Sequence, residues 1–524
     1  MKINVGILGI AGAMLMSSCA HQRSSVTGWN YNDPKNGGFE VVPYEEQETG
    51  PGLVFIEGGT FTMGRAEDDV MSDWNNVPRR VTVSSFYMDE TEVTNINYLE
   101  YLYWTARVFN SNYPQIYVKA LPDTLVWRNK LAYNEPYVKY YLRHPAYQDY
   151  PVVGINWLQA TDFCKWRTDR VNEFILVREG ILDWNPSPQD ADYFNTDTYL
   201  AGKWTGQVKT PMPDLNPNGN GERNVRMEDG IFLPDYRLPT EAEWEFAAYG
   251  LIGNTTLELI FQRRIYPWNG HATRNPDEKY IGQELSNFVK GAGDYMGVAG
   301  DLNDAGDITT PVYSYWPNDY GLYGMAGNVS EWVMDVYRPL TPDDEFEFRP
   351  FRGNVYQTQV KDQDGIVAED SLRYAVRLIP GAGTSDQPVY DSDIVSVPGQ
   401  VKYRTVDKNH KEDNLAERRN YHESDERDYQ DGDVQSSVYY LDGDGAKANH
   451  PEGIMYQTGT KTLISDETHV YKGGSWKDRA FWMSPGTRRY LEEHQATDYI
   501  GFRCAMTRVG SPIGMGGKNE GGKY

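Results

Sequence analysis

The chain has 524 residues, of which 39% are hydrophobic and 13% aromatic, and it carries a formal net charge of −25 at pH 7. This length holds either one large domain with insertions or two to three ordinary domains. The acidity argues against nucleic acid or an anionic membrane surface as the main partner, because both need clustered lysine and arginine. Solubility explains the charge; divalent cations and basic partners are the alternatives.

The first eighteen residues have the pattern of an export signal. An apolar run over 3–16 is too short to span a bilayer as a mature helix and has the length of a signal-peptide core. It ends in LMSSC (15–19), which resembles a bacterial lipobox. We therefore expect a lipoprotein signal peptide over 1–18 and a lipid (palmitate) on Cys19; an ordinary signal peptide followed by a chance cysteine is the alternative. Ala20 and His21 are not acidic, so we expect an anchor in the outer membrane, on its periplasmic face.

The residues that follow predict a tether and then strands. Residues 19–51 are polar and lack a helical period, as expected of a membrane tether. Runs rich in β-forming residues at 53–56 and 60–64 flank a glycine pair, which predicts a hairpin. A further strand is expected over 80–88.

Three helices are predicted from their N-terminal caps. The first begins after Thr94 or Asn95, where apolar residues recur at helical spacing. The second begins after Asn156. The third begins after Thr240, which forms a capping-box pattern with Glu243. Capping, rather than catalysis, is therefore the expected role of the acidic residues at this third helix.

Besides Cys19, the sequence contains two cysteines, Cys164 and Cys504. Cys164 shares a face of the second predicted helix with Trp157 and Ala160, so it should point inward. In an oxidising compartment an even pair is more typical of a disulfide, and two free thiols are the alternative.

Three long polar stretches interrupt these elements, at about 107–150, 170–233 and 338–465. Stretches of this length within one domain usually carry function or partner contacts. The Gly-rich end, 509–524, is expected to be a flexible tail.

Seven short segments of the chain form a characteristic ordered set. They are 59–64 (GTFTMG), 151–157 (PVVGINW), 237–245 (RLPTEAEWE), 266–268 (YPW), 321–332 (GLYGMAGNVSEW), 473–476 (GGSW) and 501–503 (GFR). In this order they resemble the formylglycine-generating enzymes, the sulfatase-modifying-factor family, over about 52–508. The resemblance implies an α+β fold of the C-type-lectin-like kind with little regular secondary structure. It also implies a structural disulfide between Cys164 and Cys504.

The catalytic positions implied by the resemblance are altered. Active members bind copper through two cysteines shortly after the Gly-Gly-Ser segment, because Cu(I) requires soft thiolates. Aligned from Gly473, those positions hold Asp478 and Met483, and Ser330 stands where the family has a tryptophan. We therefore expect a pseudoenzyme that binds no copper; a divergent oxidoreductase of the formylglycine-generating type is the alternative.

The resemblance also implies two structural calcium sites. Calcium is a hard cation that prefers carboxylate and carbonyl oxygens. Gly324 replaces the usual Asp or Asn ligand of the first site, and an acidic loop held by Asx turns without metal is the alternative for the second. The implied ligands are Gly327, Val329 and Glu331 in the first site, and Asn287, Phe288, Asp304 and Gly306 in the second.

A lipobox followed by a degenerate domain of this family resembles the gliding-motility lipoproteins of the type IX secretion machinery. This implies a non-catalytic, lipid-anchored structural component with protein partners in the cell envelope, among them gliding lipoprotein K and other type IX secretion components. Arg479, Trp482 and Arg488 are the expected contact side chains. A glycan- or peptidoglycan-binding module, suggested by fold analogy and aromatic content, is a further alternative.

Overall fold

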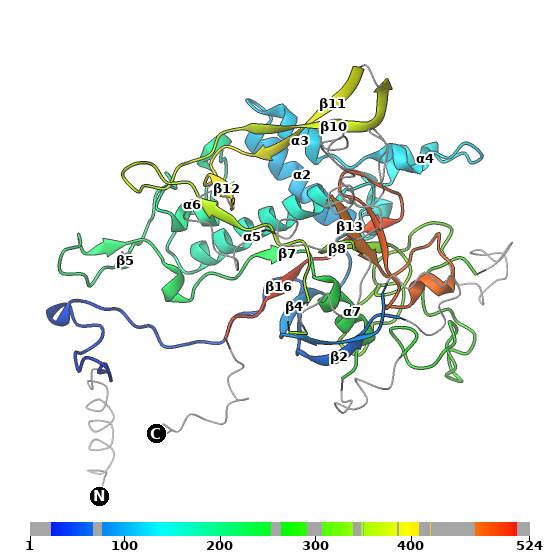
Figure 1. The fold of residues 1–524 in the computed structure, drawn as a ribbon, viewed down its shortest axis with the longest axis horizontal. Helices are drawn as coiled ribbons and strands as arrows, with labels where there is room; N and C mark the ends of the chain where they lie inside the picture. The colour runs from blue at the N-terminus through cyan, green and yellow to red at the C-terminus, as the bar shows by residue number, and fades with distance from the viewer. Residues whose placement is uncertain are drawn as a thin grey trace, which may run out of the picture.

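The computed structural model has an α+β fold with about 23% helix and 20% strand, which agrees with the expected low content of regular structure (Figure 1). Within the described residues, no helix is long and apolar enough to cross a membrane. The structure describes residues 22–65, 76–252, 264–290, 306–338, 347–348, 350–384, 387–407, 420 and 467–510.

One four-stranded sheet joins the start of the domain to its end. Its strands follow the order β1 (Leu53–Ile56), β4 (Phe86–Asp89), β16 (Ala505–Thr507) and β7 (Tyr236–Arg237). All three pairings are antiparallel. The last described strand thus lies between two strands from much earlier in the chain.

The second four-stranded sheet carries the segment that closes the domain. Its order is β14 (Arg489–Glu492), β13 (Thr468–Lys472), β8 (Ser330–Val336) and β15 (Ile500–Gly501). Strand β13 is buried along its whole length. Side chains of the paired strands β8 and β13 consequently lie side by side inside the molecule.

The hairpin predicted between residues 53–56 and 60–64 is wrong. Strand β2 (Gly59–Met63) pairs with β3 (Arg79–Val83), whereas β1 pairs with β4, so the expected strand over 80–88 is two strands. A Cβ on Gly58 would lie 2.3 Å from the Val83 carbonyl oxygen. Gly58 therefore permits close backbone approach where the chain passes between sheets, and it does not form a hairpin turn.

The three predicted helices are confirmed together with their caps. They are α2 (Asn95–Phe109), α5 (Trp157–Arg178) and α7 (Glu241–Tyr249). Each begins with a reciprocal capping box, formed by Thr94 with Asn97, Asn156 with Gln159, and Thr240 with Glu243.

Short elements fill the predicted polar stretches. They are α3 (Pro114–Ala120), α4 (Glu135–Tyr140), α6 (Thr196–Leu200), and three two-stranded pairs: β5 (Met212–Pro213) with β6 (Glu222–Arg223), β9 (Gln357–Gln359) with β12 (Tyr403–Thr405), and β10 (Arg373–Thr384) with β11 (Gln387–Ser396). The β10–β11 hairpin extends beyond the main body (Figure 1). Most of the stretch 408–466 lies outside the described residues.

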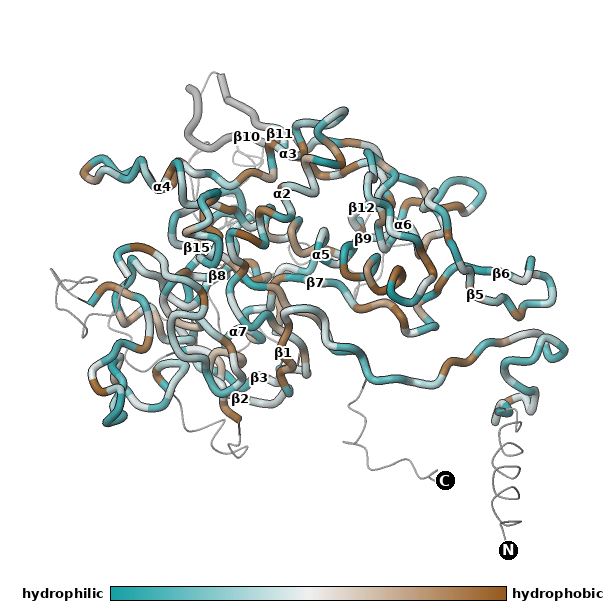
Figure 2. Tube along the Cα trace, turned by 180° about the vertical axis from the view of Figure 1, so that it is seen from behind, coloured by the Kyte–Doolittle hydropathy of each residue, from teal (hydrophilic) through white to brown (hydrophobic). Residues whose placement is uncertain are grey.

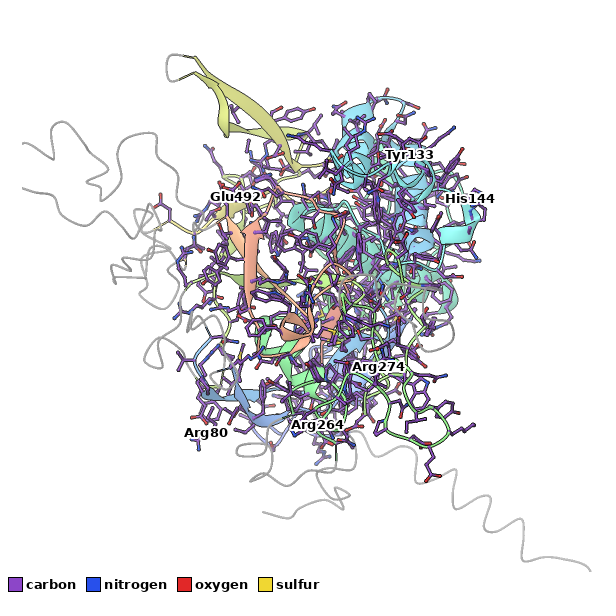
Figure 3. All side chains as sticks on the ribbon, turned by 90° about the vertical axis from the view of Figure 1, so that its right-hand side faces the viewer. Arg80, Tyr133, His144, Arg264, Arg274 and Glu492 are labelled. Atoms are coloured by element: carbon purple, nitrogen blue, oxygen red, sulfur yellow. The ribbon has the colours of Figure 1, made fainter. Side chains whose placement is uncertain are left out.

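Two apolar clusters form the centre of the fold. One packs α2 and α5 against β15 and β16, and the other surrounds Trp244 of α7. Hydrophobic residues gather along α5 and β1, while the β5–β6 arm is mainly hydrophilic (Figure 2). Exposed side chains such as Tyr133 and His144 lie at the helical end, and Arg80 and Arg264 lie at the other end (Figure 3).

The second half of the predicted tether lies against the domain. Glu40 pairs with Arg223, and the Glu48 carboxylate accepts two hydrogen bonds of 2.8 Å from Arg178. The side-chain oxygen Oε1 of Gln47 accepts a hydrogen bond of 2.7 Å from the Val509 backbone amide. The N-terminal segment is therefore held by contacts next to the last strand of the domain.

Candidate functional site

The segment 471–504 combines strands β13, β14 and β15 with a loop that lies over β8. Two glycines with positive φ, Gly473 (98°) and Gly474 (69°), begin the loop. A Cβ on Gly473 would meet the Trp244 ring at 3.0 Å, and one on Gly474 would meet the Trp482 carbonyl oxygen at 2.9 Å. Only glycine suits both the backbone conformation and the space at these positions.

Asp478, at the first position where the resemblance implies a copper ligand, is held by three hydrogen bonds from two side chains. Its carboxylate accepts two hydrogen bonds of 2.7 Å from Arg489 and one of 2.5 Å from the Ser475 hydroxyl. Arg489 also donates to the Ser330 hydroxyl at 2.9 Å. Ser330, which the resemblance places at the family's tryptophan position, thus takes part in the network that fixes Asp478.

Met483, at the second such position, is fully buried in an apolar cluster. Its buried neighbours are Tyr266, Phe288 and Ala326. A thioether among aromatic and aliphatic groups contributes packing and cannot form a thiolate. The two positions therefore provide an ion-paired carboxylate and a core side chain.

A chain of buried charges lies behind this loop. Lys472 is fully buried and donates to Glu241 at 3.2 Å and to Glu245 at 2.9 Å. Arg488 is 2% exposed and pairs with Glu241 at 2.9 Å. The prediction that Arg488 lies on a contact surface is therefore wrong, because its guanidinium neutralises an internal carboxylate. Arg479 is exposed, as predicted.

Asp335 belongs to strand β8, and its side chain lies at the start of helix α7. Its carboxylate accepts a hydrogen bond from the Glu241 backbone amide at 2.7 Å and one from the Arg352 backbone amide at 3.3 Å. Burial, followed by the nearby Glu241 carboxylate, raises the pKa of Asp335 to about 8.

Glu331, one of the predicted calcium ligands, is engaged in a buried ion pair. Arg503 donates to both of its oxygens at 2.7 Å, and the Trp244 indole donates to Oε2 at 2.7 Å. The GFR and SEW segments quoted above are thus joined by this pair. A buried carboxylate with three charge-assisted or indole hydrogen bonds is well stabilised.

Cys164 and Cys504, predicted from the sequence to pair, are brought together. Both are buried free thiols, with Sγ atoms 3.5 Å apart. The juxtaposition is as predicted, while the disulfide bond itself stays a prediction. Burial of the thiols raises the pKa of Cys504, so direct attack by the thiol on an outside reagent is disfavoured.

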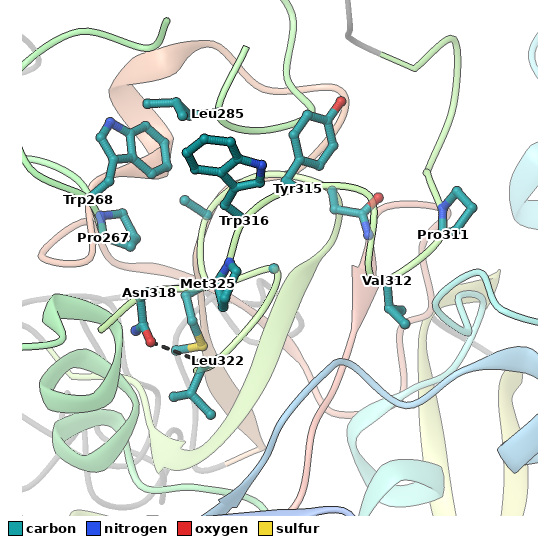
Figure 4. Close-up of a pocket in the computed structure, with 14 residues that line it drawn as sticks. Pro267, Trp268, Leu285, Pro311, Val312, Tyr315, Trp316, Asn318, Leu322 and Met325 are labelled. Atoms are coloured by element: carbon teal, nitrogen blue, oxygen red, sulfur yellow. Dashed lines mark hydrogen bonds between the residues drawn. The ribbon is translucent and has the colours of Figure 1, made fainter. Parts of the chain in front are cut away.

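A small aromatic pocket opens beside the segment that precedes strand β8 (Figure 4). The side chains of Trp268 and Trp316 line it, together with Pro267, Leu285 and Tyr315. Gly324 and Asn328 also line it. The pocket therefore reaches the backbone of the segment that precedes β8.

A scan of family models matches residues 38–377 to the sulfatase-modifying factor enzyme 1-like domain. The chain belongs to this family. The match covers more than half of the sequence and includes α5, α7 and β8. The family expected from the sequence is confirmed, and with it the fold class.

Curated members of the family include active and inactive enzymes. The chain is 26% identical over 286 residues to the formylglycine-generating enzyme of Mus musculus, a match that covers 54% of the chain and 58% of that protein. It is 26% identical over 299 residues to the inactive C-alpha-formylglycine-generating enzyme 2 of Mus musculus, covering 56% of the chain and 71% of that protein. The chain thus matches little more than half of the length of the mouse enzyme.

The solved structure of PvdO from Pseudomonas aeruginosa shares 15% identity, with 87% of this chain and 94% of that one covered and a TM-score of 0.37.

The predicted calcium ligands form two sets. In the second set, the Asn287 amide accepts from the Gly306 amide at 2.9 Å and donates to the Ile308 carbonyl at 2.7 Å. Phe288 is buried in the cluster around Met483. Asp304 lies outside the described residues. Hydrogen bonds therefore close this loop, and its calcium site stays a prediction.

In the first set, the ligand chemistry fits a hard cation. Glu331 and Val329 are fully buried, and Gly327 has a positive φ of 71°. Glu92, which sequence reasoning missed, projects its carboxylate against Gly324. Burial first, and then the Glu331 charge, raise the pKa of Glu92 to about 7, although Arg503 opposes this. No group of three His, Cys, Asp or Glu side chains suited to a metal occurs in the described part of the chain, so backbone oxygens would have to contribute.

Sequence reasoning also missed Asp335 and Lys472. Nothing in the local sequence marks Asp335 or Glu92. For Lys472 a signal existed, since it directly precedes the Gly-Gly pair at the end of a fully buried strand. For Glu92 the only signal was indirect, namely the missing oxygen at Gly324.

Proposed function

We propose that this family member is a non-catalytic, lipid-anchored structural component of an outer-membrane machinery. The observation that carries the proposal is the pair Asp478 and Met483. One is held in ion pairing with Arg489 and the other is buried in the core. Cu(I) chemistry needs two accessible thiolates close together.

The inactive mouse relative supports this proposal, because the family includes a curated protein that is described as inactive. The active relatives support the rival function, a divergent oxidoreductase. The two are separated by titrating the purified chain with Cu(I) against a colorimetric chelator and by incubating it with a cysteine-containing sulfatase peptide. We expect no competition for copper and no aldehyde product by mass spectrometry.

A matched variant sharpens this test. Restoring both thiols in Asp478→Cys/Met483→Cys should create competition for Cu(I), whereas Asp478→Ser/Met483→Ser should not. Tight copper binding together with peptide conversion by the unaltered chain would refute the non-catalytic proposal.

The machinery we propose is the gliding-motility and type IX secretion apparatus, in which the chain would take the place of lipoprotein J. The support is the lipobox at 15–19 combined with the altered catalytic positions. Cross-linking in the native envelope followed by affinity purification should recover lipoprotein K and other type IX secretion components. Recovery of peptidoglycan or glycan fragments without those proteins would favour the glycan-binding alternative instead.

The anchor is tested separately. Cys19 lies outside the described residues, so its lipidation rests on the sequence pattern. Cys19→Ala should abolish incorporation of a clickable palmitate analogue and release the protein from the outer-membrane fraction. Cys164→Ala, which removes a buried thiol, should leave labelling unchanged.

A further inference from the structure

Two histidines converge on one carboxylate beside the second four-stranded sheet. His469 belongs to the buried strand β13, and its Nε2 lies 3.2 Å from Oε2 of Glu493. His494 follows Glu493 in the chain, and its Nε2 lies 3.1 Å from Oε1 of the same carboxylate. The Glu493 backbone is fixed, because its amide donates to the Glu467 carbonyl at 2.7 Å and its carbonyl accepts from the Trp157 amide at 3.0 Å. The carboxylate is thus held between two imidazole rings.

His494 also reaches the β10–β11 hairpin, which extends beyond the main body (Figure 1). Its Nδ1 lies 3.2 Å from Oδ2 of Asp393, a residue of β11. The other carboxylate oxygen of Asp393 lies 3.4 Å from Nζ of Lys119 in α3. The side chains of His494, Asp393 and Glu493 are between 18% and 22% exposed, so water screens their contacts only in part. His494 therefore lies between a carboxylate of the sheet and a carboxylate of the hairpin.

The two nitrogens of His494 can both be satisfied only by a charged ring. A neutral imidazole has one N–H donor and one lone pair, whereas an imidazolium donates from both nitrogens. A neutral His494 would place its lone pair against an oxygen of either Asp393 or Glu493. The imidazolium is attracted to both carboxylates, so protonation of this ring joins the hairpin to the sheet.

His469 has a different environment. Its ring is stacked on the Trp157 indole, with the ring centroids 3.7 Å apart and an angle of 10° between the planes. It is 5% exposed, and its Nδ1 is buried without a hydrogen-bond partner among the described residues. An imidazolium here would bury a second N–H that has no acceptor, which is unfavourable. A neutral His469 that donates from Nε2 to Glu493 fits this environment, and the proton that joins the hairpin belongs to His494.

We propose that His494 is a pH-sensitive latch that holds the base of the β10–β11 hairpin against the body of the protein. When His494 is protonated, it bridges Asp393 and Glu493; when it loses the proton, the bridge opens. The latch is expected to be closed at about pH 5.5 and open at about pH 8, because imidazoles ordinarily titrate near pH 6.5 and two carboxylates favour the charged form. The proposal is independent of the non-catalytic function proposed above.

The remaining contacts of the hairpin base do not change with His494. Ile394, next to Asp393 on β11, packs against the apolar cluster that contains Trp104 and Phe109. The latch therefore sets how firmly the hairpin is held, and it does not decide whether the domain folds. The titratable or charged groups that face the latch are Asp393 from β11, Glu493 from the end of β14, His469 from β13 and, through Asp393, Lys119 from α3.

The test is hydrogen exchange of the full-length chain in detergent at about pH 5.5 and about pH 8, read by mass spectrometry and divided by the intrinsic exchange rates. A two-stranded hairpin alone is only marginally stable, so exchange in β11 reports its attachment. The β11 amides should be protected about fivefold more at the acid pH, because opening then costs a charge-assisted contact. His494→Gln cannot take up a proton and should lose this pH dependence. His144→Gln is the matched control, because that exposed ring bonds only the Ala146 amide in its own turn, and it should behave as the unaltered chain.

A permanent cation distinguishes a charge switch from a merely structural side chain. His494→Lys should keep β11 protected at both pH values. Asp393→Asn removes the hairpin partner and should abolish the pH dependence, which keeps the test decisive if His494→Gln folds poorly. Asp335 titrates in the same range but is present in every variant, so the differences between variants report the latch. Equal protection of β11 at the two pH values in the unaltered chain, or a pH response that His494→Gln or Asp393→Asn retains, would overturn the proposal.

Discussion

Arg503 and Glu331 are both fully buried and are joined by two hydrogen bonds of 2.7 Å. Removing one partner of such a pair leaves an uncompensated charge in the interior. Arg503→Met should therefore lower the free energy of unfolding by about 3–5 kcal/mol, measured by urea denaturation. Arg80→Ala, which breaks a surface pair with Glu347, should leave it nearly unchanged.

A double variant separates charge from packing at this pair. Arg503→Met/Glu331→Gln removes both charges, so it should be more stable than Arg503→Met. If the single and double variants were equally unstable, lost packing rather than the unpaired carboxylate would explain the effect.

Asp335 should make the free energy of unfolding fall as the pH rises, which is opposite to the effect of a carboxylate whose pKa is lowered by folding. Its pKa is raised from 3.8 to about 8, mainly by burial. Between these values the folded chain keeps a proton that the unfolded chain has released, so stability falls as the pH rises from about 4 through about 8. Asp335→Asn should remove this contribution, which urea denaturation across that pH range measures. The exposed Asp183→Asn should leave the pH profile unchanged.

Among the elements, helix α5 depends on a local cap. The Asn156 side chain accepts from the Gln159 amide at 2.8 Å, and the Gln159 side chain accepts from the Asn156 amide at 3.0 Å. Asn156→Ala should cost about 1 kcal/mol of stability in chemical denaturation. Lys165→Ala, at an exposed position of the same helix, should be nearly neutral. A neutral Asn156→Ala would mean that tertiary packing alone fixes the start of α5.

The helix starts could be predicted from the sequence because each cap joins residues three positions apart. The strand pairing could not be predicted. Whether 53–56 pairs with 60–64 or with 86–89 is decided by contacts far along the chain, including the insertion of β16 beside β4. A glycine pair permits a turn and close backbone approach equally, and the sequence does not distinguish the two.

The candidate site, like the fold, could be predicted only in part from the sequence. Positions 478 and 483 were assigned by their short spacing after Gly473, and their status as altered catalytic positions stays a prediction. The buried role of Arg488 and the approach of Glu92 to Gly324 depend on segments more than 200 residues apart. Family motifs located the segments, and only the folded chain showed which charges they neutralise.

At the scale of the whole molecule, Cys164 and Cys504 can join two segments separated by 340 residues. Cys164 lies on α5, and Cys504 directly precedes β16, the strand between β4 and β7. A bond between them would close the chain from residue 164 to residue 504 into one loop. In the chain-entropy model this contributes about 6 kcal/mol before any strain in the folded state.

We therefore expect the protein extracted under non-reducing conditions to contain this disulfide. Denaturation with an alkylating reagent, followed by mass spectrometry, should find neither thiol modified, and reduction should lower the free energy of unfolding by several kcal/mol. Cys504→Ser should reproduce the stability of the reduced chain and lose its response to reductant. Two alkylated thiols in material isolated without reductant would contradict the pairing and assign both cysteines to the apolar core, where their buried side chains already pack.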